Sequence, residues 1–276
     1  MLVLALALGC VRQSGAELHL VERSGVGWSG AGQNEAERLS AWIGTMDRKS
    51  NNKNISIIVR DVTRAYRSGG SEFWALKGVS LDILPGTLTI LRGRSGSGKT
   101  TLMNIIGALE EPTGGSVTYG DRDITRLGES DRDALRRRSV GFVFQSVALI
   151  PTMNAYENVE FPLRIARASK GARVDECLRL VGLSARSKHM PQELSGGEQQ
   201  RVAIARAIAH KPDIIFADEP TAELDTQTAV QVAKIFRDLV DKEKMTVVLA
   251  THDISLLDIA DRVYYMEDGR IVEGDA

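Results

Sequence analysis

A glycine-rich stretch in the first half of the chain has the residues needed to hold phosphate groups. It fits the phosphate-loop pattern GxxxxGK[ST], with an apolar run before it and helical spacing after it. Its residues are Gly93, Arg94, Ser95, Gly96, Ser97, Gly98, Lys99 and Thr100. The glycines let backbone N–H groups surround an anion at the positive end of a helix. We expect Lys99 to reach the β- and γ-phosphates of a nucleotide and Thr100 to hold Mg²⁺.

Four polar residues at the ends of later apolar runs complete a candidate hydrolytic site. Asp218 ends the run IIFAD and is placed to bind Mg²⁺, while Glu219 can orient and deprotonate the attacking water. His252 follows VVLAT and could donate to the γ-phosphate. Gln145 follows VGFVF and could contact both Mg²⁺ and the water. The plainer alternative, strand-end residues that only cap their neighbours, does not explain the phosphate loop.

A second glycine turn lies about a hundred residues after the first. Residues 194–200 read LSGGEQQ and precede the helical pattern VAIARAIA, but no lysine follows the glycines. Such a helix start can bind an anion but cannot complete an ATPase alone. The simplest solution is a head-to-tail pair, in which this turn caps the γ-phosphate held by another copy.

The order of apolar runs predicts an α/β fold. Short β-branched runs alternate with helical segments, which favours a mostly parallel sheet covered on both faces. Ligands bind beyond the carboxyl ends of such strands, so the run before the phosphate loop and the three runs that end at Gln145, Asp218-Glu219 and His252 should converge on one site. Residues 146–205 read as helices, and Asp268-Gly269 predicts a closing hairpin turn. The run Arg136-Arg137-Arg138 is interpreted as a solvated turn before a strand.

These motifs, in this order, resemble the nucleotide-binding subunits of ATP-binding-cassette (ABC) transporters. The match in motif order runs from about Tyr66 to His252, and the general layout extends over residues 54–276. LSGGEQQR, in register with the phosphate loop and the acidic strand end, is its most specific part. The resemblance implies a P-loop NTPase (RecA-like) core, an antiparallel β subdomain and an inserted α-helical subdomain near residues 146–205. It also implies ATP hydrolysis with Mg²⁺.

The resemblance assigns further roles to matching positions. Tyr66 would stack on adenine, although it could be only a surface tyrosine, and Phe73 or Trp74 could serve instead. The phosphate-binding segment would extend to Thr101. The residues that would act on the nucleotide of a partner copy are Ser195, Gly196, Gly197, Gln199 and Asp225. Glu223 departs from the small or amide residues usual at its position, which leaves the details of this cross-talk open.

The branch of the family indicates the partners. LIPTMNAYENVEFPL and ADEPTAELD look like the lipoprotein-releasing, macrolide-export and cell-division subgroup, whose ATPases pair with separate membrane permeases. Tyr156-Glu157-Asn158 would lie where a permease docks, unless this is an ordinary helix of the lobe. An amino-acid importer ATPase and a soluble ATPase, for example of cluster assembly, remain alternatives. We expect a homodimer, peripheral on the cytoplasmic face of the inner membrane.

Composition sets the remaining limits. The formal net charge of −1 gives no basic field for nucleic acid, so none is expected as a partner. Cys10 and Cys177 cannot form a disulfide framework, and Cys177 is predicted to be a buried thiol. Residues 1–53 show no sustained period and are expected to be an N-terminal extension, either disordered or the product of a mis-assigned start, of which 1–45 would be dispensable. ALGC resembles a lipoprotein cleavage box, but the downstream ATP chemistry argues against it.

Overall fold

The computed structural model describes residues 11–14, 17–20, 55–166 and 171–272. Within the predicted extension it describes an antiparallel pair, β1 (Val11–Ser14) and β2 (Glu17–Leu20). The rest of residues 1–53, Cys10 included, lies outside the described residues, and the proposed dispensability of residues 1–45 stays a prediction. Among the described residues, no helix is long and apolar enough to cross a membrane.

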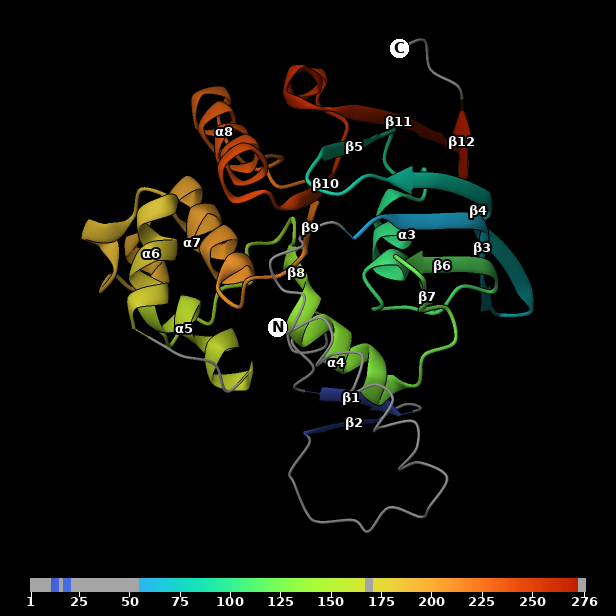
Figure 1. Cartoon of the computed structure of the whole chain (residues 1–276), viewed down its shortest axis with the longest axis horizontal. Helices are drawn as coiled ribbons and strands as arrows, with labels where there is room; N and C mark the ends of the chain where they lie inside the picture. Colours follow the sequence, from blue (N-terminus) through green and yellow to red (C-terminus); the bar gives the residue numbers. More distant parts are fainter. Residues whose placement is uncertain (1–10, 15–16, 21–54, 167–170, 273–276) are drawn as a thin grey trace.

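A six-stranded sheet forms the centre of the domain (Figure 1). Its order is β12-β11-β5-β10-β9-β8, with five parallel strands and an antiparallel edge strand. The strands are β5 (Leu88–Arg92), β8 (Val140–Val143), β9 (Ile214–Asp218), β10 (Thr246–Thr251), β11 (Arg262–Glu267) and β12 (Arg270–Val272). The predicted parallel sheet and the hairpin turn at Asp268-Gly269 are therefore confirmed.

Alternation along the strands divides the interior into two apolar cores. Ile215 and Ala217 of β9 join one core, while Ile214 and Phe216 join the other. Successive side chains of a strand point to opposite faces, so a continuous apolar run supplies both cores at once. Both faces of the sheet are consequently covered.

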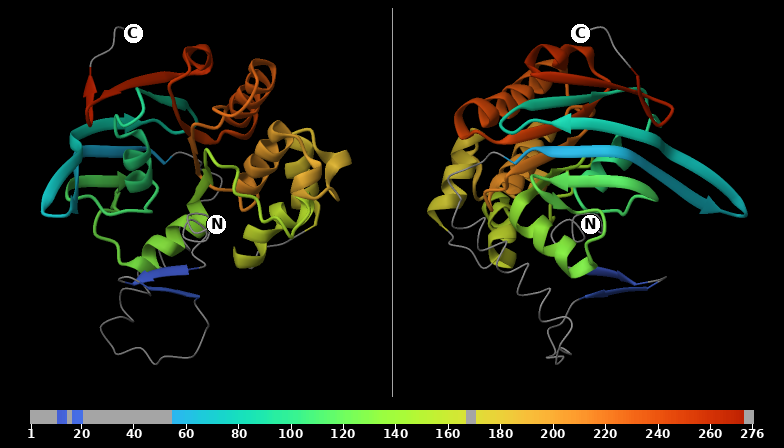
Figure 2. Two further views of the ribbon diagram at one scale, coloured as in Figure 1. Left: turned by 180° about the vertical axis from the view of Figure 1, so that it is seen from behind. Right: turned by 45° about the vertical axis from the view of Figure 1, so that its right-hand side comes forward.

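The second core lies between the central sheet and an antiparallel sheet of order β4-β3-β6-β7 (Figure 2). These strands are β3 (Ile57–Ser68), β4 (Ser71–Ile83), β6 (Gly114–Tyr119) and β7 (Arg122–Asp123). Helix α3 (Lys99–Ile106) fills this core with Leu102, Met103 and Ile106. The expected antiparallel β subdomain is thus present beside the helix that follows the phosphate loop.

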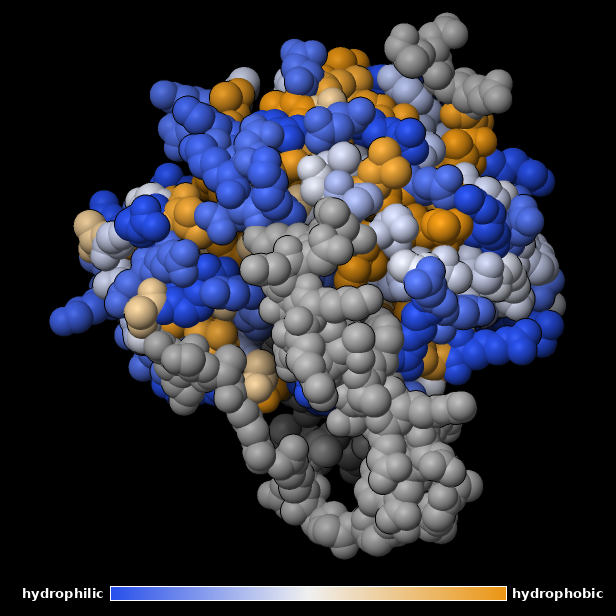
Figure 3. Space-filling view, viewed as in Figure 1, coloured by the Kyte–Doolittle hydropathy of each residue, from blue (hydrophilic) through white to orange (hydrophobic). Residues whose placement is uncertain are grey.

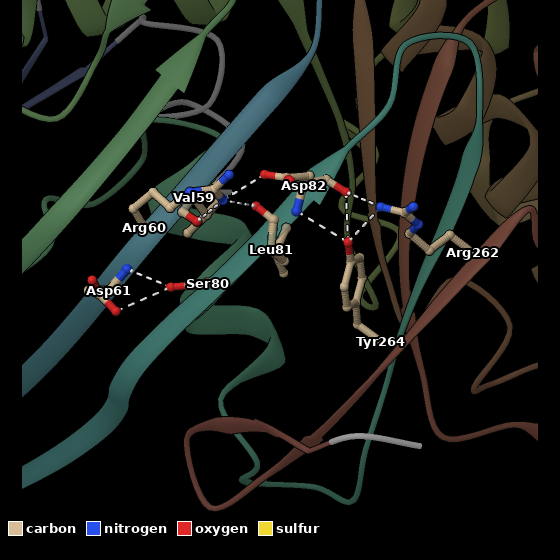
Figure 4. A network of polar contacts seen from close by, with 8 residues as sticks. All are labelled: Val59, Arg60, Asp61, Ser80, Leu81, Asp82, Arg262 and Tyr264. Carbon is tan, nitrogen blue, oxygen red and sulfur yellow. Dashed lines mark hydrogen bonds and ion pairs between the residues drawn. The ribbon is translucent and has the colours of Figure 1, made fainter. Parts of the chain in front are cut away.

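Hydrogen bonds attach this β subdomain to the central sheet (Figure 4). The Tyr264 hydroxyl on β11 donates to the carbonyl of Asp82 at 2.9 Å and accepts from its N–H at 3.2 Å. Arg262 donates to the same hydroxyl at 3.0 Å, and Arg60 pairs with the Asp82 carboxylate at 2.6 Å. The end of β4 is therefore held against β11 through one tyrosine.

Helices on the other face form a lobe with the first core. They are α5 (Ala155–Ala166), α6 (Ala172–Leu180) and α7 (Gly196–Ile208), with short helices η1 (Ser184–Arg186) and η2 (Pro191–Glu193). Cys177 is buried there, as predicted. Beside the lobe lie α8 (Thr226–Glu243) and η3 (Ile254–Ile259). Hydrophilic residues cover most of the visible surface of α6 and α8 (Figure 3).

The arginine run at residues 136–138 differs from its predicted structure. It forms the last turn of α4 (Glu129–Ser139), not a solvated turn. Arg136 is only 2% exposed; it pairs with Asp133 and Glu129 and donates to the carbonyl of Ala108. The interpretation was wrong because the acidic partners lie at helical spacing on the same helix. Of the three, Arg138 is exposed and Arg137 is half-buried.

Candidate active site

The four predicted strand ends lie side by side. β5, β10, β9 and β8 are consecutive neighbours and run parallel, so their carboxyl ends share one edge of the sheet. Register places Arg92 opposite Thr251, and Ala250 opposite Asp218. The phosphate loop and the residues after β8, β9 and β10 therefore begin at one edge, where open α/β sheets bind ligands.

The glycines of the phosphate loop are required by space as well as by conformation. A Cβ atom on Gly93 would lie 2.3 Å from the carbonyl oxygen of Met266. Gly98 has φ of +103°, and a Cβ atom there would lie 2.7 Å from the carbonyl oxygen of Ala75. Both glycines therefore lie too close to neighbouring backbone to carry a side chain, and the positive φ of Gly98 also favours glycine.

Lys99 is folded back onto this loop. Its Nζ donates to the carbonyls of Gly93 at 2.7 Å and Arg94 at 3.1 Å, and lies 3.6 Å from Glu219 Oε1. The residue is only 5% exposed. A buried ammonium among carbonyl oxygens is suited to meet an entering polyanion, because phosphate oxygens can replace those weaker acceptors.

Thr100 and Asp218 form the predicted metal-binding pair. The Thr100 hydroxyl donates to Asp218 Oδ2 at 2.7 Å. Among the residues that the structure describes, Asp218 Oδ1 is buried and has no hydrogen-bond partner. Burial raises the pKa of Asp218, and the hydrogen bond from Thr100 opposes this shift. An unsatisfied buried carboxylate oxygen beside a hydroxyl fits a hard cation such as Mg²⁺, which takes oxygen ligands.

Glu219 and His252 are in direct contact. The His252 Nδ1 lies 2.9 Å from Glu219 Oε2. Glu219 has φ of +45°, in the left-handed region, and its N–H donates to the carbonyl of Ala250 at 2.9 Å. This uncommon backbone conformation turns the carboxylate back toward Lys99 and His252 instead of continuing the strand.

A cavity of about 340 Å³ adjoins this group. Gln145 lines it together with Thr100 and Asp218, as the strand order predicts. Asn104 and Glu223 also line it. Glu223, the departure from the family pattern, therefore brings a carboxylate to the side of the candidate metal pair within the same chain.

The second glycine turn begins α7 as predicted. Ser195 is the N-cap, and Glu198 accepts from the Ser195 N–H at 2.9 Å, which completes a capping box. The Gln199 Nε2 donates to the carbonyls of Pro191 and Leu194 at 2.9 and 3.0 Å. The amide nitrogen of Gln199 thus stabilises the turn of its own chain, a contact that the sequence did not predict.

Asp225 also has a local structural role. It caps α8: its Oδ1 accepts from the Thr228 N–H at 3.0 Å and its Oδ2 from the Thr228 hydroxyl at 2.6 Å. These hydrogen bonds lower the pKa of Asp225. Its predicted relay across a dimer stays a prediction.

Tyr66 lies on β3, directly opposite Phe73 on β4. Tyr66 is 36% exposed, Phe73 63% and Trp74 38%. Three aromatic side chains therefore remain accessible near this pair of strands. The Tyr66 hydroxyl donates to Glu110 at 2.7 Å, a partner that no sequence pattern indicates because 44 residues separate the two.

The predicted site residues fall into two groups that one chain does not bring together. Lys99, Thr100, Asp218, Glu219 and His252 are joined by the contacts above. Among the described residues, no hydrogen bond or ion pair joins this group to the second one, formed by Ser195, Gly196, Gly197, Gln199 and Asp225. The buried residues of α3 belong to one core and those of α7 to the other, so the two glycine turns begin helices on opposite faces of the sheet.

Comparisons with known proteins identify the family of this chain. A family model described as ABC transporter matches residues 76–222. An uncharacterized ABC transporter ATP-binding protein, MJ0796 of Methanocaldococcus jannaschii, is 41% identical over 78% of this chain and 94% of its own length. The lipoprotein-releasing system ATP-binding protein LolD of Geobacter metallireducens is 44% identical over 78% of this chain and 96% of its own.

A longer relative and two solved structures complete the comparison. The chain spans 31% of the macrolide export ATP-binding/permease protein MacB of Syntrophobacter fumaroxidans, at 43% identity. A dimeric structure of MJ0796 in a post-hydrolysis state with ADP and Pi matches with a TM-score of 0.74 and 39% identity. It covers 79% of this chain and 97% of the solved one. A second dimeric MJ0796 structure has a TM-score of 0.73.

The resemblance stated from the motifs is confirmed by this agreement over most of the chain. The phosphate loop, the paired Glu219 and His252, and the capped LSGGEQQ turn lie in the fold that the relatives share. The chain belongs to the ABC transporter family, as an ATP-binding domain that hydrolyses ATP.

Proposed function

We propose that two copies of this chain close head-to-tail around two Mg-ATP and that their opening and closing drives a separate membrane permease. One observation carries the first half of this proposal. The phosphate loop and the LSGGEQQ turn belong to helices on opposite faces of one sheet, so a single chain does not complete the site. A second copy, turned head-to-tail, supplies the missing turn. The dimeric structures of MJ0796 support this arrangement.

Within each site, the residues divide the work by their contacts. The backbone of Gly93–Thr101 and the Lys99 ammonium bind the triphosphate, and Tyr66 stacks on adenine. Thr100, Gln145 and Asp218 would hold Mg²⁺, which neutralises phosphate charge when bound. Glu219 orients and deprotonates the attacking water, while His252, 2.9 Å away, holds the carboxylate in place.

The γ-phosphate, which ATP has and ADP lacks, would control whether the dimer is closed or open. Ser195, Gly196 and Gly197 of one copy donate to the γ-phosphate held by the other, and Gln199 and Asp225 support that surface. Charge-assisted hydrogen bonds contribute roughly 1.5–3 kcal/mol each. Loss of the γ-phosphate therefore removes several kcal/mol that favour the closed dimer, and only such a difference shifts the equilibrium.

The names of relatives support a permease of the lipoprotein-release or macrolide-export type. The chain would then lie peripherally on the cytoplasmic face of the membrane. The sequence placed the permease contact at residues 156–158, but the exposure of these residues favours the loop before them. Asn158 is 0% exposed and cannot itself meet a partner, whereas Pro151 and Thr152, in the loop that Asn158 holds, are exposed. We therefore propose that loop as the docking element.

Glu219→Gln tests the dimer and the role of the carboxylate together. The amide keeps the size of the side chain but cannot take a proton, so ATP binding should persist, turnover should stop and the closed dimer should accumulate. Gel filtration with Mg-ATP measures the dimer. The control is Glu267→Gln, which changes the exposed glutamate that ends β11 and should leave turnover and elution unchanged. A Glu219→Gln monomer with undiminished turnover contradicts the proposal.

Co-purification from detergent-solubilised membranes tests the permease. We expect a protein with four membrane-spanning helices and a large external domain to accompany the chain. A permease of another architecture would favour an importer instead. Recovery of the chain only with soluble assembly proteins would overturn the transport role while leaving ATP hydrolysis intact.

A further inference from the structure

Tyr66 is held by a small polar network that the sequence motifs do not include. Its hydroxyl donates to Glu110 Oε2 at 2.7 Å. The other carboxylate oxygen of Glu110 accepts from Asn104 Nδ2 at 3.1 Å. Asn104 is part of α3, the helix that begins at Lys99. The ring is therefore connected through one carboxylate to the helix that follows the phosphate loop.

Arg64 completes the network from the same strand. Its guanidinium carbon lies 4.7 Å from the centroid of the Tyr66 ring, in a cation–π contact. It also lies 3.5 Å from Glu110 Oε2 through Nε and donates to the carbonyl of Glu111 at 2.9 Å through NH1. Arg64 thus covers one face of the ring, so a planar ligand would have to stack on the opposite face.

We propose that Glu110 is a positioning residue for nucleotide binding: with Arg64, it fixes the Tyr66 ring at the orientation in which its free face stacks on the base of ATP. This proposal rests on the stacking role of Tyr66 proposed above. An unrestrained tyrosine would lose rotational freedom when the base binds, which weakens binding. A ring already held by Glu110 has less freedom to lose.

The environment of the hydroxyl agrees with a restrained ring. Burial and the hydrogen bond to Glu110 raise the pKa of Tyr66, while contacts with Thr101 and Arg64 oppose the shift. Thr101 lies in the first turn of α3, directly after the phosphate loop, so the Tyr66 hydroxyl lies near the start of that helix. We therefore expect substitution of Glu110 to weaken binding of the base of ATP and to leave the rate of the hydrolysis step unchanged.

The variants Glu110→Ala and Tyr66→Phe test this, with Glu111→Ala as matched control. Glu111 is the next residue and a carboxylate, but it pairs with Arg132 at 2.9 Å. Calorimetry should show that the Kd for ATP rises about three- to tenfold in Glu110→Ala and in Tyr66→Phe. This rise corresponds to losing part of the binding free energy that stacking of the base contributes. The double variant should bind ATP no more weakly than the weaker-binding single variant does, because both substitutions remove the same hydrogen bond. Glu111→Ala should bind ATP like the wild type.

Inorganic tripolyphosphate separates positioning from a general structural effect. It carries the phosphates without a base, so Glu110→Ala should bind it as the wild type does. The KM for ATP should rise while kcat at saturating ATP stays unchanged. The proposal is overturned if Glu110→Ala binds ATP normally, or if it loses tripolyphosphate and ATP affinity equally. Failure of the wild type itself to bind ATP would instead remove the proposed function.

Discussion

A Cβ atom added to Gly197 would lie 2.1 Å from the Cγ2 methyl of Thr228. Gly197 is in the first turn of α7, and Thr228 is in the first turn of α8. The hydroxyl of the same threonine donates to Asp225 at 2.6 Å. One side chain therefore sets the distance between the LSGGEQQ turn and the cap of α8, so Gly197 is needed for packing within the subunit as well as for the phosphate contact proposed above.

Gly197→Ala should destabilise the domain, because a methyl group placed 2.1 Å from another carbon forces the two helices apart. Overpacking of this kind costs about 1–3 kcal/mol, and urea unfolding measures it. Gly196→Ala is the control, since its nearest atom, in Leu224, would be 3.9 Å away. Adding Thr228→Ser, which removes the methyl but keeps the hydroxyl, should restore stability to Gly197→Ala. A stable Gly197→Ala protein would show that the helices move apart freely.

Arg136→Met should lower the free energy of unfolding by about 3–5 kcal/mol, because it leaves the buried carboxylate of Asp133 without its partner. Burial already raises the pKa of Asp133, and Arg136 opposes that shift. Arg138→Ala, at an exposed position of the same run, should change stability by less than about 0.5 kcal/mol. Equal losses in the two variants would mean that the buried ion pair is not what stabilises α4.

Asn158→Ala should release the loop before α5. Asn158 Oδ1 accepts from the Ile150 N–H at 2.8 Å, and its Nδ2 donates to the carbonyls of Ile150, Met153 and Asn154. Each buried group left unpaired costs about 1–3 kcal/mol. Hydrogen exchange at the Ile150 amide should accelerate in Asn158→Ala and stay slow in Thr152→Ala, an exposed position of the same loop. An amide that stays protected in both would refute this role.

His210 should make the fold sensitive to acid. Its Nε2–H donates to the carbonyl of Val140 at 3.0 Å, and its Nδ1 is buried with no hydrogen-bond partner in the described part of the chain. Burial lowers the pKa of His210 from 6.5 to about 4. Between these values the unfolded chain binds a proton that the folded chain excludes, so stability falls as pH falls, by up to about 3 kcal/mol. His210→Gln keeps a donor but does not titrate.

Unfolding of the wild type and of His210→Gln at pH 7 and pH 5 measures this difference. The wild type should lose more free energy of unfolding between the two conditions than the variant does. Titration of the imidazole by NMR provides the direct value. A pKa near 6.5 in the folded protein, with equal losses in the two chains, would contradict the prediction.

The sequence determined the elements and the residue types of the site. Phosphate-loop spacing, apolar runs ending in Asp218 and His252, and the LSGGEQQ turn each rest on contacts within a few residues, which local sequence encodes. It did not place Arg136 or Glu110, because helical spacing shows which charged residues of one helix can pair but not whether they are buried. Burial and the remaining contacts depend on residues that other elements bring near, such as Ala108 for Arg136 and Tyr66 for Glu110.

Only the tertiary structure decided which groups meet. Hydrogen bonds between parallel strands placed Glu219 beside His252, 33 residues away in the chain. Side chains alternate between the two faces of each central strand, and α3 packs on one face of the sheet while α7 packs on the other. That separation is a property of the packed sheet and of no local segment, and it is the physical reason why the second glycine turn is available to another chain.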